Sequence, residues 1–206
     1  MGTCFLEVLK MKEIEIKIKI ENIKEIRDKI LNLNVEFIKT EKEIDEYFDF
    51  EDKTLINADK TLRIRNKEVV CFKGPRENNQ TFQRKARSLK DSCDKRISEE
   101  TETKIQNYEN FINFLNKSGI KVSFVKEKMR EYFKKDNLII TIDTLPCLGS
   151  FIEIEGPEEA IDNAAKKLGF SKDDYITEIY SELFNKFKKE NNIQAKWMVF
   201  ENDDQK

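Results

Sequence analysis

The chain has 206 residues, and its 38 lysines and arginines nearly balance 40 aspartates and glutamates at a net charge of −2. This length suits one domain, and a hydrophobic share of 38% with 15 phenylalanines is enough for a packed core. The small net charge argues against a general nucleic-acid binder or membrane-surface binder, which normally carries excess basic residues. No apolar run approaches the ~18 residues that a membrane-spanning helix needs, so we expect no membrane segment.

Histidine is absent, which removes the Ser-His-Asp and Cys-His catalytic arrangements and histidine-ligated zinc. The cysteines are far apart and form no CxxC pair, at Cys4, Cys71, Cys93 and Cys147. Their spacing favours reduced thiols over a disulfide framework, and we therefore expect a cytoplasmic protein. An apolar patch in residues 1–10 is short and contains Glu7, so these residues do not match a signal peptide and are treated as an N-terminal extension.

The first predicted elements are a strand and a helix. Residues 13–20 read E-I-E-I-K-I-K-I, and this period of two predicts a strand with one isoleucine face and one charged face. Asn22 is typical of a helix N-cap, with Glu25 three residues later. Apolar residues at helical spacing then predict a helix that continues to Leu33.

The remaining chain predicts more strands than helices. Further strands are expected at residues 35–50, 61–65, 69–73, 96–105, 122–133, 138–143 and 151–155. Further helices are expected at residues 107–118, 157–168 and 177–189. Residues 76–95 are polar and predict a long mobile loop, and the tail from Asn191 has no clear pattern. The result is one α+β domain over residues 11–190, with about eight strands and a C-terminal tail at 191–206.

Charged residues on these strands form alternating pairs that are sorted by sign. The acidic pairs are Glu13/Glu15, Glu100/Glu102 and Glu153/Glu155, and the basic pairs are Arg63/Arg65 and Lys128/Arg130. An antiparallel sheet with one solvated face is the ordinary explanation of charged alternation. If these faces instead line the inside of a curled sheet, opposite charges or ligands must neutralise them. Carboxylates suit Mg²⁺ or Mn²⁺, and arginine with lysine suits a polyphosphate, so a metal–triphosphate complex would need both sets.

A series of short motifs carries a family resemblance. The motifs are, in order, E-I-E-I-K at 13–17, D-E-Y-F-D at 45–49, L-R-I-R at 62–65, F-K-G-P at 72–75, E-T-E-T at 100–103, K-M-R-E-Y at 128–132, I-D-T-L-P-C-L-G-S-F-I-E-I-E-G at 142–156 and Y-S-E-L at 180–183. Over about residues 11–187 this series resembles the CYTH, or triphosphate tunnel metalloenzyme, superfamily. That group includes class IV adenylyl cyclases, thiamine triphosphatases and inorganic tripolyphosphatases. The D-x-Y-F-D, K-G-P and L-G-x-F-I-E-I-E segments are most similar to the cyclase-like branch.

The resemblance implies a closed or nearly closed eight-stranded antiparallel β-barrel, a tunnel with charged walls and flanking helices. It implies a Mg²⁺ or Mn²⁺ site whose ligands are Glu13, Glu15, Glu100, Asp143, Glu153 and Glu155, with Glu102 as a weaker addition. It implies that the triphosphate is bound by Lys17, Arg63, Arg65, Lys73, Arg96, Lys128 and Arg130. The expected catalytic residues are Glu13, Glu15 and Lys17. Asp45, Tyr47 and Asp49 either belong to this site or are only structural residues of its rim.

The implied function is divalent-metal-dependent chemistry on a triphosphate. An adenylyl cyclase would convert ATP to cyclic AMP and pyrophosphate. A triphosphatase that hydrolyses inorganic tripolyphosphate, thiamine triphosphate or a nucleoside triphosphate stays open, because both reactions would use the same groups. A non-catalytic polyphosphate- or nucleotide-binding module is a third interpretation, and it would not need the acidic set. A homodimer is compatible with the resemblance, and we expect no nucleic-acid partner.

Overall fold

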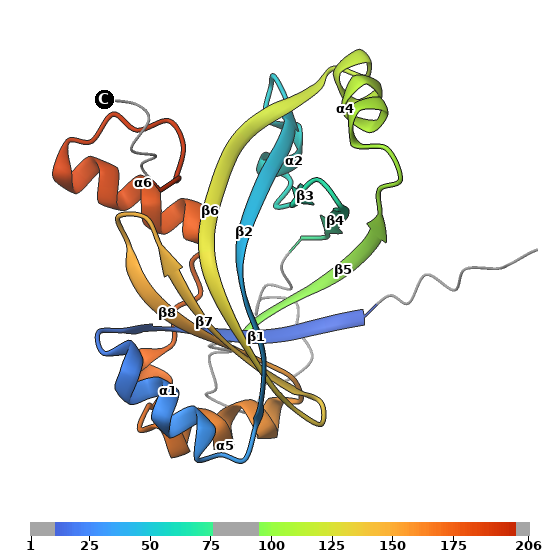
Figure 1. Ribbon diagram of the computed structural model, residues 1–206. Helices are drawn as coiled ribbons and strands as arrows, with labels where there is room; N and C mark the ends of the chain where they lie inside the picture. Colours follow the sequence, from blue (N-terminus) through green and yellow to red (C-terminus); the bar gives the residue numbers. More distant parts are fainter. Residues whose placement is uncertain (1–10, 76–94, 201–206) are drawn as a thin grey trace, which may run out of the picture.

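In the computed structural model, which describes residues 11–75 and 95–200, antiparallel strands close into a barrel (Figure 1). The strands are β1 (Met11–Ile20), β2 (Glu36–Phe50), β3 (Thr61–Arg65), β4 (Val69–Lys73), β5 (Arg96–Lys104), β6 (Ile120–Lys135), β7 (Leu138–Leu145) and β8 (Gly149–Glu155). Their order around the barrel is β1-β5-β4-β3-β2-β6-β7-β8. The expected α+β domain with a closed eight-stranded barrel and flanking helices is confirmed. The N-terminal extension, residues 76–94 of the expected loop and the end of the tail lie outside the described residues.

Two helices cover the barrel beside its first and last strands. α1 (Ile23–Leu31) and α5 (Glu158–Leu168) lie together below β1, β7 and β8 (Figure 1). The isoleucines that pack against them are Ile16, Ile18, Ile20, Ile140, Ile142, Ile152 and Ile154. Successive side chains of a strand point to opposite faces. Because the isoleucine faces of β1 and β8 form this outer core, their charged faces point into the barrel.

The C-terminal helix α6 (Tyr180–Asn191) and the tail cover another part of the outside. Phe184 of α6 and Met198 of the tail are fully buried in one apolar cluster. The backbone N–H of Met198 donates to the carbonyl of Val125 at 3.0 Å, and its carbonyl accepts from the N–H of Glu127 at 2.7 Å. The tail therefore docks on β6 as far as Phe200, the last described residue.

The other helices lie at the opposite end of the barrel. α4 (Tyr108–Lys117) packs Leu115 against a cluster with Phe48 and Ile64. The short α2 (Thr54–Asn57) was not predicted from the sequence, and the carboxylate of Asp49 accepts the backbone N–H groups of Leu55 and Ile56 at its start. A 3-10 turn (Lys172–Asp174) precedes α6. No helix in the described ranges is long and apolar enough to cross a membrane.

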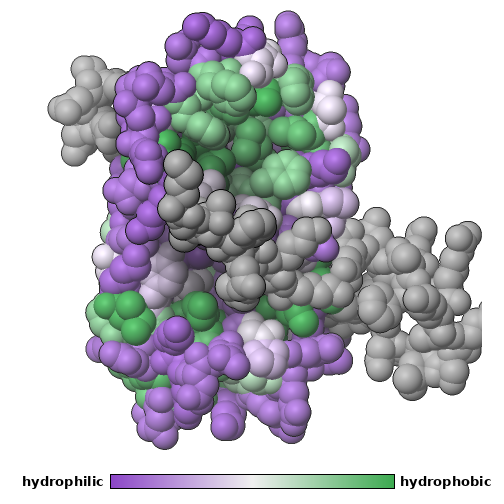
Figure 2. Space-filling view, turned by 90° about the vertical axis from the view of Figure 1, so that its right-hand side faces the viewer, coloured by the Kyte–Doolittle hydropathy of each residue, from purple (hydrophilic) through white to green (hydrophobic). Residues whose placement is uncertain are grey.

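An apolar groove lies outside the barrel, between α4 and the strands β4 and β5. Its lining includes Val70, Ile105, Phe111 and Phe114. Figure 2 shows apolar side chains gathered around a hollow in the upper part of this face. The groove is separate from the charged faces of the strands, which point into the barrel.

Candidate functional site

Basic side chains from four strands converge inside the barrel. They are Lys17 of β1, Arg63 and Arg65 of β3, Lys73 of β4, and Lys126, Lys128 and Arg130 of β6. Lys128 is only 1% exposed, which places it among the most buried residues of the protein. Lysine and arginine are almost never buried to this extent unless they are paired, so the acidic partners define the site as much as the bases do.

Strand register places acidic side chains directly opposite several of these bases. Lys17 is opposite Glu153 in the β1–β8 pair, with Nζ 3.4 Å from the carboxylate. Lys73 is opposite Glu100 in the β4–β5 pair, at 2.7 Å. Arg63 also reaches Glu100, at 3.5 Å. Pairing across neighbouring strands therefore joins predicted metal ligands to predicted substrate-binding residues.

Asp143 of β7 is a fully buried carboxylate that receives several donors. Arg130 lies opposite it in register and forms a forked pair with both carboxylate oxygens. Lys128 Nζ lies 3.2 Å away, and the Tyr180 hydroxyl donates at 3.0 Å. Arg130 also contacts Glu153. Burial alone would lower the pKa of Arg130, but Asp143 and Glu153 outweigh it and hold the pKa well above its usual value.

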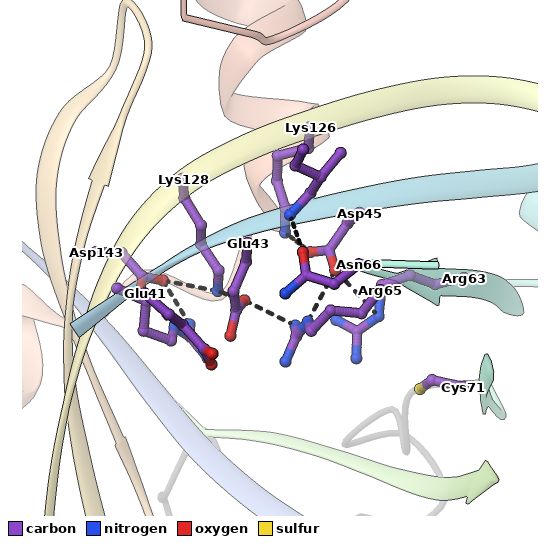
Figure 3. A network of polar contacts seen from close by, with 12 residues as sticks. Glu41, Glu43, Asp45, Arg63, Arg65, Asn66, Cys71, Lys126, Lys128 and Asp143 are labelled. Carbon is purple, nitrogen blue, oxygen red and sulfur yellow. Dashed lines mark hydrogen bonds and ion pairs between the residues drawn. The ribbon is translucent and has the colours of Figure 1, made fainter. Parts of the chain in front are cut away.

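A second fully buried carboxylate, Glu43 of β2, was not predicted from the sequence (Figure 3). Its Oε2 lies 3.1 Å from both the Lys128 ammonium and the Arg65 guanidinium, and the Tyr132 hydroxyl donates to its other oxygen. Burial would raise the pKa of Glu43, but Lys128, Arg130 and Arg65 outweigh burial and lower the pKa to about 2. Glu43 is therefore an ionised carboxylate in the interior of the protein.

Asp45 of β2 is the third fully buried carboxylate, and it lies at the centre of the cations rather than at the rim (Figure 3). Its carboxylate accepts from Arg65 Nε at 2.9 Å and lies 2.9 Å from Lys126 Nζ and 3.7 Å from Arg63 Nε. Burial opposes ionisation here as well, but Lys126, Arg63 and Arg65 hold the pKa of Asp45 well below its usual value. Lys126, which was not among the predicted site residues, is thus part of the same network.

Tyr180, the first residue of α6, closes the interior on the side of that helix. Its ring faces the ammonium groups of Lys17 at 4.2 Å, Lys126 at 5.3 Å and Lys128 at 6.0 Å, all within the range of cation–π attraction. The hydroxyl is committed to Asp143. From the sequence, Tyr180 stood out only as part of a family motif, because an aromatic residue at a helix start gives no signal of this role.

The strongest candidate metal ligands lie on β1 and β8. Glu15 lies opposite Glu155, next to the Lys17–Glu153 pair. Side chains opposite one another on antiparallel strands come within about 5 Å, and carboxylate oxygens are the donors that Mg²⁺ and Mn²⁺ prefer. These carboxylates have the chemistry that a hard divalent cation prefers, but the oxygens of Glu15, Glu153 and Glu155 do not all lie within 4.8 Å of one another. The backbones of Glu13 and Arg96 lie opposite Ser98 and Glu15 respectively, but their side chains lie outside the description.

A second group of potential ligands, Cys71, Glu100 and Glu102, fits a hard cation less well. Their ligand atoms lie within 4.8 Å of one another. The Cys71 thiol donates to Glu100 at 2.6 Å, and burial together with Glu100 raises the pKa of the thiol to about 12. Arg63 lies 3.5 Å from each carboxylate. A protonated thiol is a poor metal ligand, and it therefore disfavours a metal ion between these residues.

A closed antiparallel barrel whose interior pairs carboxylates with lysines and arginines defines the class of protein. The family model described as the CYTH domain matches residues 11–180, which is most of the chain. The protein therefore belongs to the CYTH family, and the family resemblance stated from its motifs is confirmed.

Several relatives are similar over nearly their whole length. A protein of Methanocaldococcus jannaschii named "Putative adenylate cyclase MJ0240" is 30% identical over 186 residues, 84% of this chain and 98% of the relative. The structure of PH1819 from Pyrococcus horikoshii is 26% identical at a TM-score of 0.62, over 84% of this chain and 98% of that one. A Hippeastrum structure has 18% identity and a TM-score of 0.59, over 84% and 95% of the two chains. It is described as a "putative adenylyl cyclase" that reveals a dominant triphosphatase activity.

Proposed function

We propose that the protein is a divalent-metal-dependent enzyme that binds the triphosphate of ATP inside the barrel and forms cyclic AMP and pyrophosphate. The observation that carries the proposal is the convergence of paired lysines and arginines from β1, β3, β4 and β6 on one interior. Such a density of fixed positive charge suits a polyphosphate more than any neutral ligand. The name of the M. jannaschii relative supports the cyclase reaction.

The basic residues would bind and orient the triphosphate. Arg63, Arg65 and Arg130 offer forked guanidinium donors, while Lys17 and Lys73 act as point charges. Lys128, whose side chain is only 2% exposed, would contribute its nearby positive charge without direct contact. We expect these groups, with Arg96 as a further predicted contact, to stabilise the charge that develops on the leaving pyrophosphate. Their pairing with carboxylates fixes their positions before substrate arrives, so that little reorganisation accompanies the reaction.

Glu15, Glu153 and Glu155 would hold Mg²⁺ or Mn²⁺, which would supply positive charge beside the phosphate oxygens. Lys17 and Arg130 both contact Glu153 and so fix its orientation. Glu15 and Lys17 both point inward from β1, in agreement with their predicted catalytic role near this carboxylate group.

All six predicted metal ligands stay predictions, and three of them have a weaker case than Glu15, Glu153 and Glu155. The side chain of Glu13 lies outside the description. Glu100 already contacts Lys73 and Arg63, and Asp143 contacts Arg130 and Lys128. We propose that Glu100 and Asp143 contribute mainly by orienting these cations.

The products formed from separate substrates test the proposal. Purified protein is incubated with ATP, inorganic tripolyphosphate or thiamine triphosphate, each with Mg²⁺ or Mn²⁺. Cyclic AMP together with pyrophosphate supports the cyclase. Tripolyphosphate binding without turnover of any substrate would indicate a binding module, and the absence of both binding and turnover contradicts the proposal.

A double substitution tests the metal assignment. Replacing Glu153 and Glu155 with glutamine removes two of the proposed ligand charges, so we expect metal-dependent turnover to fall on the order of 100-fold or more. Glu159→Gln, on the exposed surface of α5, is the matched control and should keep normal turnover. Normal turnover in the double variant would exclude these carboxylates as essential metal ligands.

Triphosphate hydrolysis is the second candidate, with water attacking the terminal phosphorus. The Hippeastrum protein, which shares this fold and is described as having a dominant triphosphatase activity, favours it. The described interior is also dominated by groups suited to the triphosphate, with the aromatic ring of Tyr180 already facing lysines. Release of orthophosphate from tripolyphosphate or ATP without cyclic AMP would select this reaction.

A further inference from the structure

The carboxylates inside the barrel differ sharply in their access to solvent. Glu43 and Asp45 have no exposed surface, whereas the side chain of Glu153, a proposed metal ligand, keeps 14%. A group without exposed surface cannot touch a bound ligand unless the barrel rearranges. Glu43 and Asp45 therefore differ in kind from the carboxylates proposed to hold a metal ion.

Glu43 and Asp45 are shared between cations rather than paired with one each (Figure 3). Arg65 bridges Asp45 at 2.9 Å and Glu43 at 3.1 Å, and Lys128 bridges Glu43 at 3.1 Å and Asp143 at 3.2 Å. The contacts make one chain of alternating charge that runs Lys126, Asp45, Arg65, Glu43, Lys128, Asp143, Arg130.

Buried cations at this spacing repel one another. Lys126, Lys128 and Arg130 occupy successive inward positions of β6, and β2 places an inward residue opposite each of them in register. Two of those residues are Asp45 and Glu43. Without these charges Lys126 and Arg65 would lose their carboxylate partners, and Lys128 would keep only Asp143. A buried cation without a counter-ion costs several kcal/mol in real proteins.

We propose that Glu43 and Asp45 are positioning residues, fixed internal counter-ions that hold Arg65, Lys126 and Lys128 in place while opposing the charge of the bound triphosphate. This inference rests on the proposed function of the same cations. The proposal predicts that loss of the Glu43 charge changes anion binding and turnover in opposite directions, which a purely structural salt bridge would not do. Loss of the Glu43 charge should strengthen binding of an anion, because one repulsive charge is removed. The same loss should slow turnover, because Arg65 and Lys128 lose the group that fixes them.

The test compares Glu43→Gln with the unaltered protein in two measurements. Binding of inorganic tripolyphosphate is measured by calorimetry in EDTA, where no turnover occurs. We expect the Kd of the variant to fall about tenfold, the order expected for one unit charge acting across partly buried protein. Turnover of whichever triphosphate the unaltered protein consumes is measured with metal, and kcat should fall about 10- to 100-fold because the cations are displaced.

Two further variants on the same site make the comparison specific. Glu41→Gln is the matched control, because Glu41 is an inward neighbour on β2 that is 30% exposed and pairs with Lys39 at 2.7 Å. We expect its Kd and kcat to stay within about threefold of normal, since water and salt screen the charge. Glu43→Asp keeps the charge on a shorter side chain, so its Kd should stay near normal. Its kcat should lie between that of the unaltered protein and that of Glu43→Gln.

The outcomes decide between distinct conclusions. If the unaltered protein neither binds tripolyphosphate nor turns over any triphosphate, both the proposed function and this inference are wrong. If it turns over a triphosphate but binds no tripolyphosphate in EDTA, only the inference is wrong. If it binds and Glu43→Gln binds no more tightly, or if Glu41→Gln tightens binding equally, only the inference is wrong. Should Glu43→Gln fail to fold, Glu43→Asp carries the test, and an unchanged kcat in that variant contradicts the positioning role.

Discussion

The buried carboxylates inside the barrel are stable as ions because each lies next to several cations. Glu43 illustrates the balance, since burial would favour its neutral form but Lys128, Arg130 and Arg65 keep it ionised. The free energy of such a carboxylate depends on pH, because the folded and unfolded chains then bind different numbers of protons.

The stability of the protein should therefore depend on Glu43 in a defined pH window. The pKa of this carboxyl is about 2 in the folded protein against 4.5 as its ordinary value. Its stabilising contribution is fully present above about pH 4.5 and is lost as the pH falls toward 2, a change on the order of 3 kcal/mol. Denaturant unfolding at pH 7, 5 and 3 should show the stability gap between normal protein and Glu43→Gln shrinking at low pH. A gap that stays constant over this range would contradict the assignment.

Sequence motifs located many of the inward residues but not all of them. Arg63 and Arg65 were predicted from L-R-I-R and do lie in the interior. Glu43 was missed because both faces of this part of β2 are charged. Glu46, on the outer face, accepts from Tyr108, and Lys42 pairs with Glu127. Only the register of β2 against β6 shows which of these charges point inward, and no local pattern contains that register.

At the scale of elements, apolar faces decide which strand faces become the interior. The isoleucine faces of β1 and β8 pack against α1 and α5, and this leaves their acidic pairs inside. Because such apolar faces repeat regularly along the sequence, the strands and the longer helices were predicted close to their observed bounds. The start of the short α2 is stabilised by hydrogen bonds from its backbone to the side chain of Asp49, which precedes the helix. The helix has no apolar periodicity of its own, so it was not predicted.

The docked tail gives a prediction about stability. Met198 is fully buried against α6 and β6, whereas the neighbouring Val199 is 37% exposed. Met198→Ala should lower the free energy of unfolding by about 2–4 kcal/mol, because it leaves a cavity in a packed cluster. Val199→Ala, as the matched control, should cost well under half of that. Equal losses in thermal or denaturant unfolding would mean that the tail does not dock as described.

Across the whole molecule, the near-neutral net charge hides a strongly charged interior. Acidic and basic residues are paired across strands from both halves of the chain, as in Lys17 with Glu153 and Asp45 with Lys126. Composition alone could not distinguish this arrangement from an ordinary charged surface, because both arrangements have the same numbers of charged residues. Because the barrel is closed, these paired charges lie in its interior rather than on the surface.

Ligand binding inside a closed barrel should stabilise the entire fold. Tripolyphosphate with Mn²⁺ at about 100 times its Kd should add about 2.7 kcal/mol of stability. For a chain of this size the melting temperature should then rise by roughly 5–10 °C. Orthophosphate at the same concentration is the control, because a single phosphate reaches fewer cations. A shift that sodium chloride of equal ionic strength reproduces would contradict specific binding.

Closure of the barrel also orders events during synthesis. β1 pairs with β5 on one side and with β8 on the other. The first strand of the barrel to leave the ribosome therefore cannot complete its pairing until the last strand has emerged. Contacts between such distant segments form slowly. Until residues 149–155 emerge, Lys17 lacks its partner Glu153, and the charged face of β1 stays hydrated. The nascent chain can therefore hold its charges in water until β8 arrives, and the complete site exists only after that strand has been made.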